Sequence, residues 1–175
     1  MTMTETADAE TRTPYKVATE IIGRLAGEHF GTGPLADLRR MNPRVAVPST
    51  PALHRLLARH VDLHWLNGEG LTRWALLVHL VALISPLTWR PDSPSLGKAL
   101  FAAGYKDGRL TALLEADEAD FPVVLPRMMR FLAAKQASPQ PYQLIALVLF
   151  GGREADRMAI ARDFYGAEAL AAKAD

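Results

Sequence analysis

The sequence contains no cysteine among its 175 residues. This absence excludes a disulfide framework, a thiolate zinc site and a cysteine nucleophile, and it favours an intracellular protein. Residues 1–13 are polar and partly acidic, and they lack the basic start and apolar run of a secretory signal. The most apolar stretch, residues 74–89, includes His79 and Pro86 and falls short of the ~20 residues that span a bilayer. We therefore expect a cytoplasmic protein with no membrane partner.

The sequence also lacks any sustained alternation of apolar and polar residues, so strands are not expected. Alanine and leucine are abundant, and apolar residues recur with the helical period. We predict an all-α fold, an irregular helical bundle of eight or nine short helices. The predicted helices cover residues 15–30, 34–40, 50–65, 71–84, 95–103, 107–116, 120–136, 138–150 and 153–165.

One helical domain is predicted over residues 14–166, between a flexible tail at 1–13 and an alanine-rich tail at 167–175. Helix 71–84 is apolar on almost every side, which predicts a central position and makes His79 a hydrogen-bonded core histidine. Pro126 leaves two alternatives for helix 120–136, namely a kink at the proline or a regular helix that begins there.

The net charge is only +1, so bulk electrostatics does not indicate a polyanionic partner. The distribution is more informative, because residues 38–61 contain five arginines and residues 121–153 contain four basic residues, with no acid in either window. Phosphate binding needs basic side chains without competing carboxylates, and we expect folding to gather these arginines on one positive strip. The pairs expected to share a helical face are Arg39 with Arg40, Arg55 with Arg59, and Arg127 with Arg130.

Catalytic and metal sites are less well supported by the residues present. His60 and His64 lie four apart on one predicted helix, which is half of a metal site, but no carboxylate is an obvious third ligand. The acidic run from Glu115 to Asp120 spans the end of one predicted helix and the start of the next, where Asp120 is better explained as an N-cap. We therefore predict no catalytic residue, no bound metal and no cofactor.

Several segments, taken in order, resemble one known family. They are Leu38-Arg39-Arg40, a leucine-rich helix near Arg55, Ser95-Leu-Gly-Lys-Ala-Leu, Arg109-Leu-Thr-Ala-Leu-Leu-Glu-Ala, Leu125-Pro-Arg-Met-Met-Arg-Phe-Leu and Asp163-Phe164-Tyr165. From about Tyr15 to Tyr165 the chain is similar to the CasB proteins. These proteins form the small subunit of the type I-E CRISPR surveillance complex called Cascade.

The resemblance implies an all-helical, non-catalytic protein that assembles as two copies along the CasC filament carrying the crRNA, near the large subunit CasA. It also implies a basic surface that holds target DNA and the displaced strand of the R-loop. The family's basic residues correspond to Arg39, Arg40, Lys98, Arg109, Arg127 and Arg130. Arg55 and Arg59 join the predicted nucleic-acid-binding set on the charge argument alone.

Two other classes of protein remain as alternatives. A freestanding helix-turn-helix regulator would also have short helices and scattered arginines, although no helix here is rich in base-reading polar residues. A small metal-dependent helical enzyme would use His60, His64 and an acid. Stoichiometric zinc, iron or manganese in the purified protein would favour the enzyme.

Overall fold

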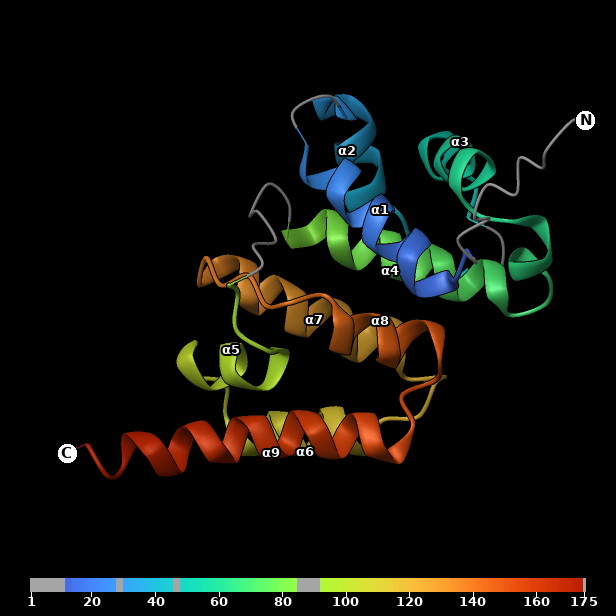
Figure 1. The fold of residues 1–175 in the computed structure, drawn as a ribbon. Helices are drawn as coiled ribbons and strands as arrows, with labels where there is room; N and C mark the ends of the chain where they lie inside the picture. The colour runs from blue at the N-terminus through green and yellow to red at the C-terminus, as the bar shows by residue number, and fades with distance from the viewer. Residues whose placement is uncertain (1–11, 28–29, 46–47, 85–91, 175) are drawn as a thin grey trace, which may run out of the picture.

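The computed structural model describes residues 12–27, 30–45, 48–84 and 92–174. Within these residues it contains nine α-helices, the short 3₁₀ helix η2 and no strand, which confirms the predicted all-α fold (Figure 1). The helices are α1 (Pro14–Ala26), α2 (Thr32–Arg40), α3 (Pro51–His60), η2 (Leu63–Leu66), α4 (Gly70–Ile84), α5 (Leu96–Ala102), α6 (Asp107–Glu115), α7 (Phe121–Ala134), α8 (Tyr142–Leu149) and α9 (Glu154–Ala171).

Helix α4 lies at the centre of the molecule, as its uniformly apolar sequence predicts. It contacts α1, α2 and α3 on one side and α7 and α8 on the other (Figure 1). Ten of its fifteen residues are buried, from Trp74 to Ile84. A helix enclosed in this way must be apolar all round, because each of its faces is covered by a neighbour.

Helix α9 forms the opposite edge of the bundle and packs mainly against α5 (Figure 1). Phe164 on α9 is 2% exposed, and its ring packs edge-on against that of Phe101 with centroids 5.6 Å apart. Gln143 of α8 connects the two helices, because its Oε1 accepts from the backbone N–H of Leu96 and its Nε2 donates to Asp163. This buried amide therefore fixes α5, α8 and α9 relative to one another.

The predicted helix 50–65 is divided in the structure. Helix α3 ends at His60, and Val61 adopts an extended backbone with φ −110° and ψ 129° while its side chain is buried. Arg12 explains the ending, since its Nη2 donates to the carbonyl oxygen of His60 at 2.6 Å and its Nη1 pairs with Asp62. Because a side chain donates to this last carbonyl oxygen, no further helical turn is needed to supply its hydrogen bond.

Other helix boundaries also differ from the prediction, and the first helix ends at Ala26 rather than at residue 30. Helix α8 begins at Tyr142 because prolines at 139 and 141 restrict the residues before them to extended backbone. Helix α9 continues beyond Tyr165 to Ala171, since one glycine weakens a helix by only ~1 kcal/mol and alanine and leucine favour it. Helix α7 begins at Phe121 and contains Pro126, so the alternative in which the regular helix starts at that proline is wrong.

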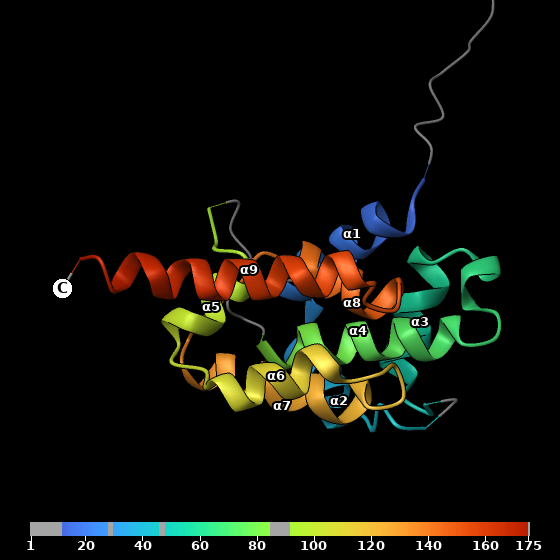
Figure 2. The same cartoon turned by 90° about the horizontal axis from the view of Figure 1, so that it is seen from below.

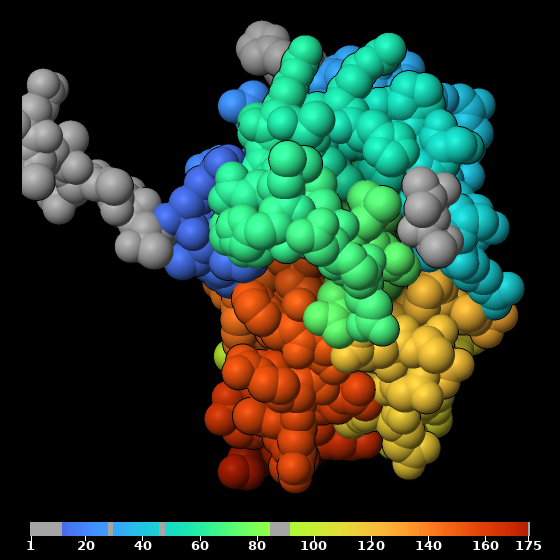
Figure 3. Space-filling model, turned by 90° about the vertical axis from the view of Figure 1, so that its right-hand side faces the viewer, coloured from blue at the N-terminus to red at the C-terminus, as the bar shows by residue number. Residues whose placement is uncertain are grey.

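Figure 2 shows α2, α6 and α7 along one side of the molecule, with α1 and α9 along the other. Figure 3 shows the start of α4 between the connection from α6 to α7 and the connection from α8 to α9. Arg73 links these segments by donating to Glu118 at 2.7 Å and to the carbonyl oxygen of Leu149. None of the helices in the described part of the chain is long and apolar enough to cross a membrane.

Candidate nucleic-acid interface

The end of α2 carries two consecutive arginines whose side chains diverge. Arg39 is half-buried, and its Nε donates to the carbonyl oxygen of Ala82 in α4 at 2.8 Å. The side chain of Arg40 is 75% exposed, and its Nη2 lies 3.0 Å from Oδ1 of Asp37. The prediction that these arginines share a helical face is wrong, because consecutive residues of a helix are rotated by about 100°. Arg39 fixes α2 to α4, whereas Arg40 lies at the surface.

His79 makes a second link between α4 and α2. It is 1% exposed, and its Nδ1 lies 2.9 Å from the carbonyl oxygen of Leu38, which confirms the predicted core histidine. Because a carbonyl can only accept, Nδ1 carries the proton of the neutral ring. Burial lowers the pKa of His79, the hydrogen bond to Leu38 raises it, and the charge of Arg130 lowers it. Helix α7, which carries Arg130, packs against α4.

Helix α7 presents Arg127 and Arg130 to solvent, one turn apart, while Met128 and Met129 are buried. Neither arginine forms an ion pair with any carboxylate in the described part of the chain. This pair therefore shares a face as predicted, and its positive charge is not neutralised locally.

Arg109 extends this surface onto α6. Its guanidinium carbon lies 6.0 Å from the ring centroid of Phe131, at the outer limit of a cation–π contact between α6 and α7. Helices α2, α6 and α7 lie towards one side in the view of Figure 2, while Figure 1 shows α2 and α6 at opposite ends of the bundle. We call the exposed arginines on these helices the α7 basic face, which consists of Arg40, Arg109, Arg127 and Arg130.

The remaining predicted residues lie elsewhere. Arg55 and Arg59 are exposed on α3, where they line a groove against α1 together with Arg24. Lys98 is exposed on α5, a helix that contributes neither to the groove nor to the α7 basic face. The structure therefore divides the expected single strip into two groups of arginines and one separate lysine, and nucleic-acid binding by these residues remains a prediction.

The predicted helical histidine pair is also wrong. His60 ends α3, and His64 lies in η2 after the extended residue Val61, so the two side chains do not share a helical face. Across the ranges that the structure describes, no group of three or more histidines and carboxylates could hold a metal ion. The ring of His64 instead packs against Trp65, with centroids 4.9 Å apart.

The acidic run before α7 serves the fold rather than forming a carboxylate cluster. Glu118 pairs with Arg73 at 2.7 Å, and Oδ1 of Asp117 accepts from the backbone N–H of Asp120 at 3.1 Å. Asp120 occupies the N-cap position of α7, but its side chain makes no capping hydrogen bond. The predicted N-cap position of Asp120 is therefore confirmed, but no side chain supplies the capping hydrogen bond, because Asp117 accepts from Asp120 itself in the turn before the helix.

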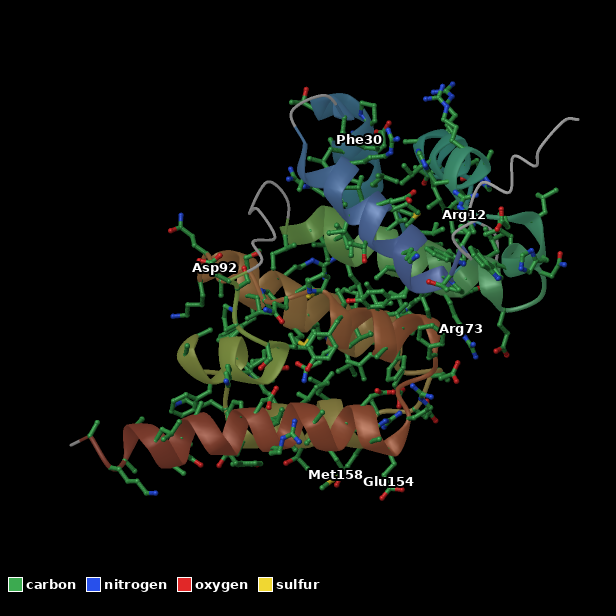
Figure 4. All side chains as sticks on the ribbon, in the orientation of Figure 1. Arg12, Phe30, Arg73, Asp92, Glu154 and Met158 are labelled. Carbon is green, nitrogen blue, oxygen red and sulfur yellow. The ribbon has the colours of Figure 1, made fainter. Side chains whose placement is uncertain are left out.

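Two important arginines were not selected from the sequence. Arg157 on α9 donates to the carbonyl oxygens of Gly152, Leu114 and Ala116, so it caps the end of α6. Arg24 lines the groove with Arg55 and Arg59. Arg24 lies in the last turn of α1, and no pattern in the sequence singled it out. Figure 4 shows all of these side chains on the ribbon, with Phe30 labelled where α1 passes into α2.

Two of the segments that carried the family resemblance meet at the crossing of α5 and α9. A Cβ atom on Gly97 would lie 2.9 Å from the backbone nitrogen of Phe164 and 2.8 Å from Cβ of Asp163. It would lie closer still to the carbonyl oxygen of Ile160. The spacing of these motifs therefore reflects a close backbone approach in the core.

Comparison with known protein families identifies the family of this chain. Residues 34–165 match the family model described as CRISPR-associated protein Cse2 (CRISPR_cse2), which covers about three quarters of the chain. The match includes the α7 basic face, Arg55, Arg59 and Lys98, and it begins after α1. Neither the curated proteins nor the solved structures gave a match.

Proposed function

The chain belongs to the CRISPR-associated Cse2 family, and we propose that it acts as the non-catalytic small subunit of a Cascade complex by holding nucleic-acid backbone on its α7 basic face. Membership of this family, also called CasB, implies the small-subunit role. The finer proposal concerns target DNA and the displaced strand of the R-loop. In RNA-guided complexes base pairing with the guide reads the sequence, so the protein surface needs only to retain the strands.

The observation that carries this proposal is the exposed pair Arg127 and Arg130, which has no carboxylate partner among the described residues. Guanidinium groups offer planar donors to phosphate oxygens and keep their charge at every physiological pH. Arg40 adds a third cation, since an exposed ion pair such as that with Asp37 contributes at most ~1 kcal/mol and exchanges readily for phosphate.

The proposed contacts give the binding a measurable salt dependence. If Arg40, Arg109, Arg127 and Arg130 each neutralise one phosphate of a single strand, log K falls with log salt with a slope of about −3, at ~0.7 per contact. Such binding has no sequence preference. The subunit alone is therefore expected to bind weakly and to act chiefly within the assembled complex.

The proposed partners are those of the family. They are a second copy of this chain, the CasC backbone that carries the crRNA, and the large subunit CasA, in the cytoplasm. Arg39 and His79 would support this assembly indirectly, because they attach the end of α2 to α4 and so hold Arg40 relative to α7.

The test is made in the assembled complex. Replacing Arg127 and Arg130 by glutamine should leave assembly intact and shorten the lifetime of the R-loop, measured by permanganate footprinting of the displaced strand over time. The matched control replaces Arg153, which precedes α9, and Arg162 on α9 by glutamine, which removes the same charge from side chains 73% and 77% exposed. Equal R-loop lifetimes in the two variants would contradict the proposal.

A further inference from the structure

A second basic site lies between α1 and α3, away from the α7 basic face. It is a groove of about 620 Å³, within the size range of small-molecule sites. Its lining comes from α1, α2 and α3 and from Gly27 and Phe30 between α1 and α2, and it includes Arg24, Arg55 and Arg59. Helix α1 precedes the residues matched by the Cse2 family model, so the groove is not contained in the matched segment.

The charge of this groove favours an anion. Three arginines line it against one glutamate, and none of the three forms an ion pair with a carboxylate in the described ranges. Arg55 and Arg59 lie one turn apart on the same face of α3, which places their guanidinium groups side by side. Burial lowers the pKa of His60, and the charges of Arg24, Arg12 and Arg59 lower it further against the opposing effect of Glu20. The positive potential therefore extends to the end of α3.

The floor of the groove is apolar, which an inorganic anion alone would not need. Ala52 and Leu56 from α3 and Pro34 from α2 lie there with Phe30, whose half-buried ring packs against the core. Gly23 of α1 and Gly27, directly after it, contribute no side chain, so a flat group can approach the backbone there beside Glu20 and Arg24. Proteins that bind single strands combine aromatic platforms for bases with cationic grooves for phosphates.

We propose that the α1–α3 groove binds one nucleotide of a single-stranded nucleic acid, with its phosphate on Arg55 and Arg59 and its base against Phe30. Which strand occupies the groove depends on the proposed function. That the groove can bind a nucleotide is argued only from the residues that line it. Arg24 faces the same phosphate from α1. The site is thus distinct from the α7 basic face, whose arginines lie on α2, α6 and α7.

The phosphate contact is tested with the whole chain and a fluorescein-labelled deoxythymidine decamer. Replacing Arg55 and Arg59 by glutamine should weaken binding ~10-fold or more and reduce the salt slope by about 1.4, for two lost contacts. The control variant, with Arg153 and Arg162 replaced, should bind as the unmodified protein does. Circular dichroism melting verifies that both variants fold. A groove variant that binds as tightly as the control would overturn the proposal.

The base contact is tested separately. Phe30→Leu keeps an apolar side chain on the core but removes the ring, so affinity for the decamer should fall about 5-fold or more. Affinity for an abasic decamer with the same phosphates should not change. Equal effects on both ligands would show that no base is read by Phe30, and the nucleotide site would be wrong.

Two further comparisons identify the occupant and separate this site from the α7 basic face. Adenosine monophosphate should bind far more weakly than the decamer, and an equal affinity would overturn the single strand as the occupant. The Arg127 and Arg130 variant should retain the effect of Phe30→Leu. If the variant at Arg127 and Arg130 binds the decamer normally while the variant at Arg55 and Arg59 binds it weakly, only the proposal for the α7 basic face is contradicted. The reverse result contradicts only the proposal for the groove.

Discussion

The crossing of α5 and α9 allows one substitution to be predicted quantitatively. Gly97 packs so closely on α9 that an added methyl group would meet the carbonyl oxygen of Ile160, the backbone nitrogen of Phe164 and Cβ of Asp163. Two of these three atoms belong to the backbone of a helix and cannot move by a rotamer change. Gly97→Ala must therefore separate the two helices or distort one of them.

The magnitude follows from two opposing effects. Forcing an extra carbon into a packed core costs typically 1–3 kcal/mol, and we expect about 3 kcal/mol here because backbone atoms are involved. Alanine in place of glycine within a helix returns ~1 kcal/mol. The net loss in the free energy of unfolding is about 2 kcal/mol, which corresponds to a fall of roughly 4–8 °C in Tm for a chain of this length.

The matched control is Gly166→Ala, the same substitution in the middle of α9. A Cβ atom at Gly166 would meet nothing within 4 Å. Only the gain in helix propensity remains, so Tm should rise by roughly 2–4 °C. Both variants are compared by differential scanning calorimetry. A Gly97→Ala protein that melts as high as Gly166→Ala would refute the account of the crossing.

Three further predictions concern charge. For the isolated chain, replacing Arg127 and Arg130 by glutamine should reduce the salt slope of single-strand binding by about 1.4, and an unchanged slope would exclude them as phosphate ligands. The pKa of His79 is lowered in the folded state, so the unfolded state binds more protons below about pH 6.5, and the free energy of unfolding should fall as the pH drops from there towards the folded pKa. Urea unfolding of His79→Gln should show a smaller loss of this free energy over the same pH range. Arg157→Met leaves three carbonyl oxygens without this donor and should cost about 2–4 kcal/mol of unfolding free energy; a loss below ~1 kcal/mol would argue against its capping role.

Helix type and approximate position could be predicted because they depend on local patterns. The uniformly apolar sequence of α4 requires neighbours on every side, and this requirement alone placed it at the centre. Gly151 and Gly152, with φ of 75° and 59°, follow the end of α8, where glycine with a positive φ is common. The break after His60 could not be predicted, because it depends on Arg12, which is distant in the sequence.

The candidate site was predicted by residue type more successfully than by arrangement. Arg127 and Arg130 share a face because helical spacing alone decides that relation. The acid-free windows predicted the ionic state of Arg55, Arg59, Arg127 and Arg130, which form no ion pair within the described residues, but not that of Arg40, which pairs with Asp37 just outside its window. Ion pairing depends on distances in the folded protein, whereas a window of sequence includes only residues that are close along the chain.

The sequence by itself determined that this chain is helical, that α4 is enclosed, and that its arginines stand in acid-poor segments, because periodicity and composition act over a few turns. The tertiary structure alone decided that Arg39 is turned inward to Ala82 while Arg55 and Arg59 meet Arg24 across a groove. These relations depend on how separate helices pack. The packing in turn depends on contacts between residues far apart in the chain, which no local pattern records.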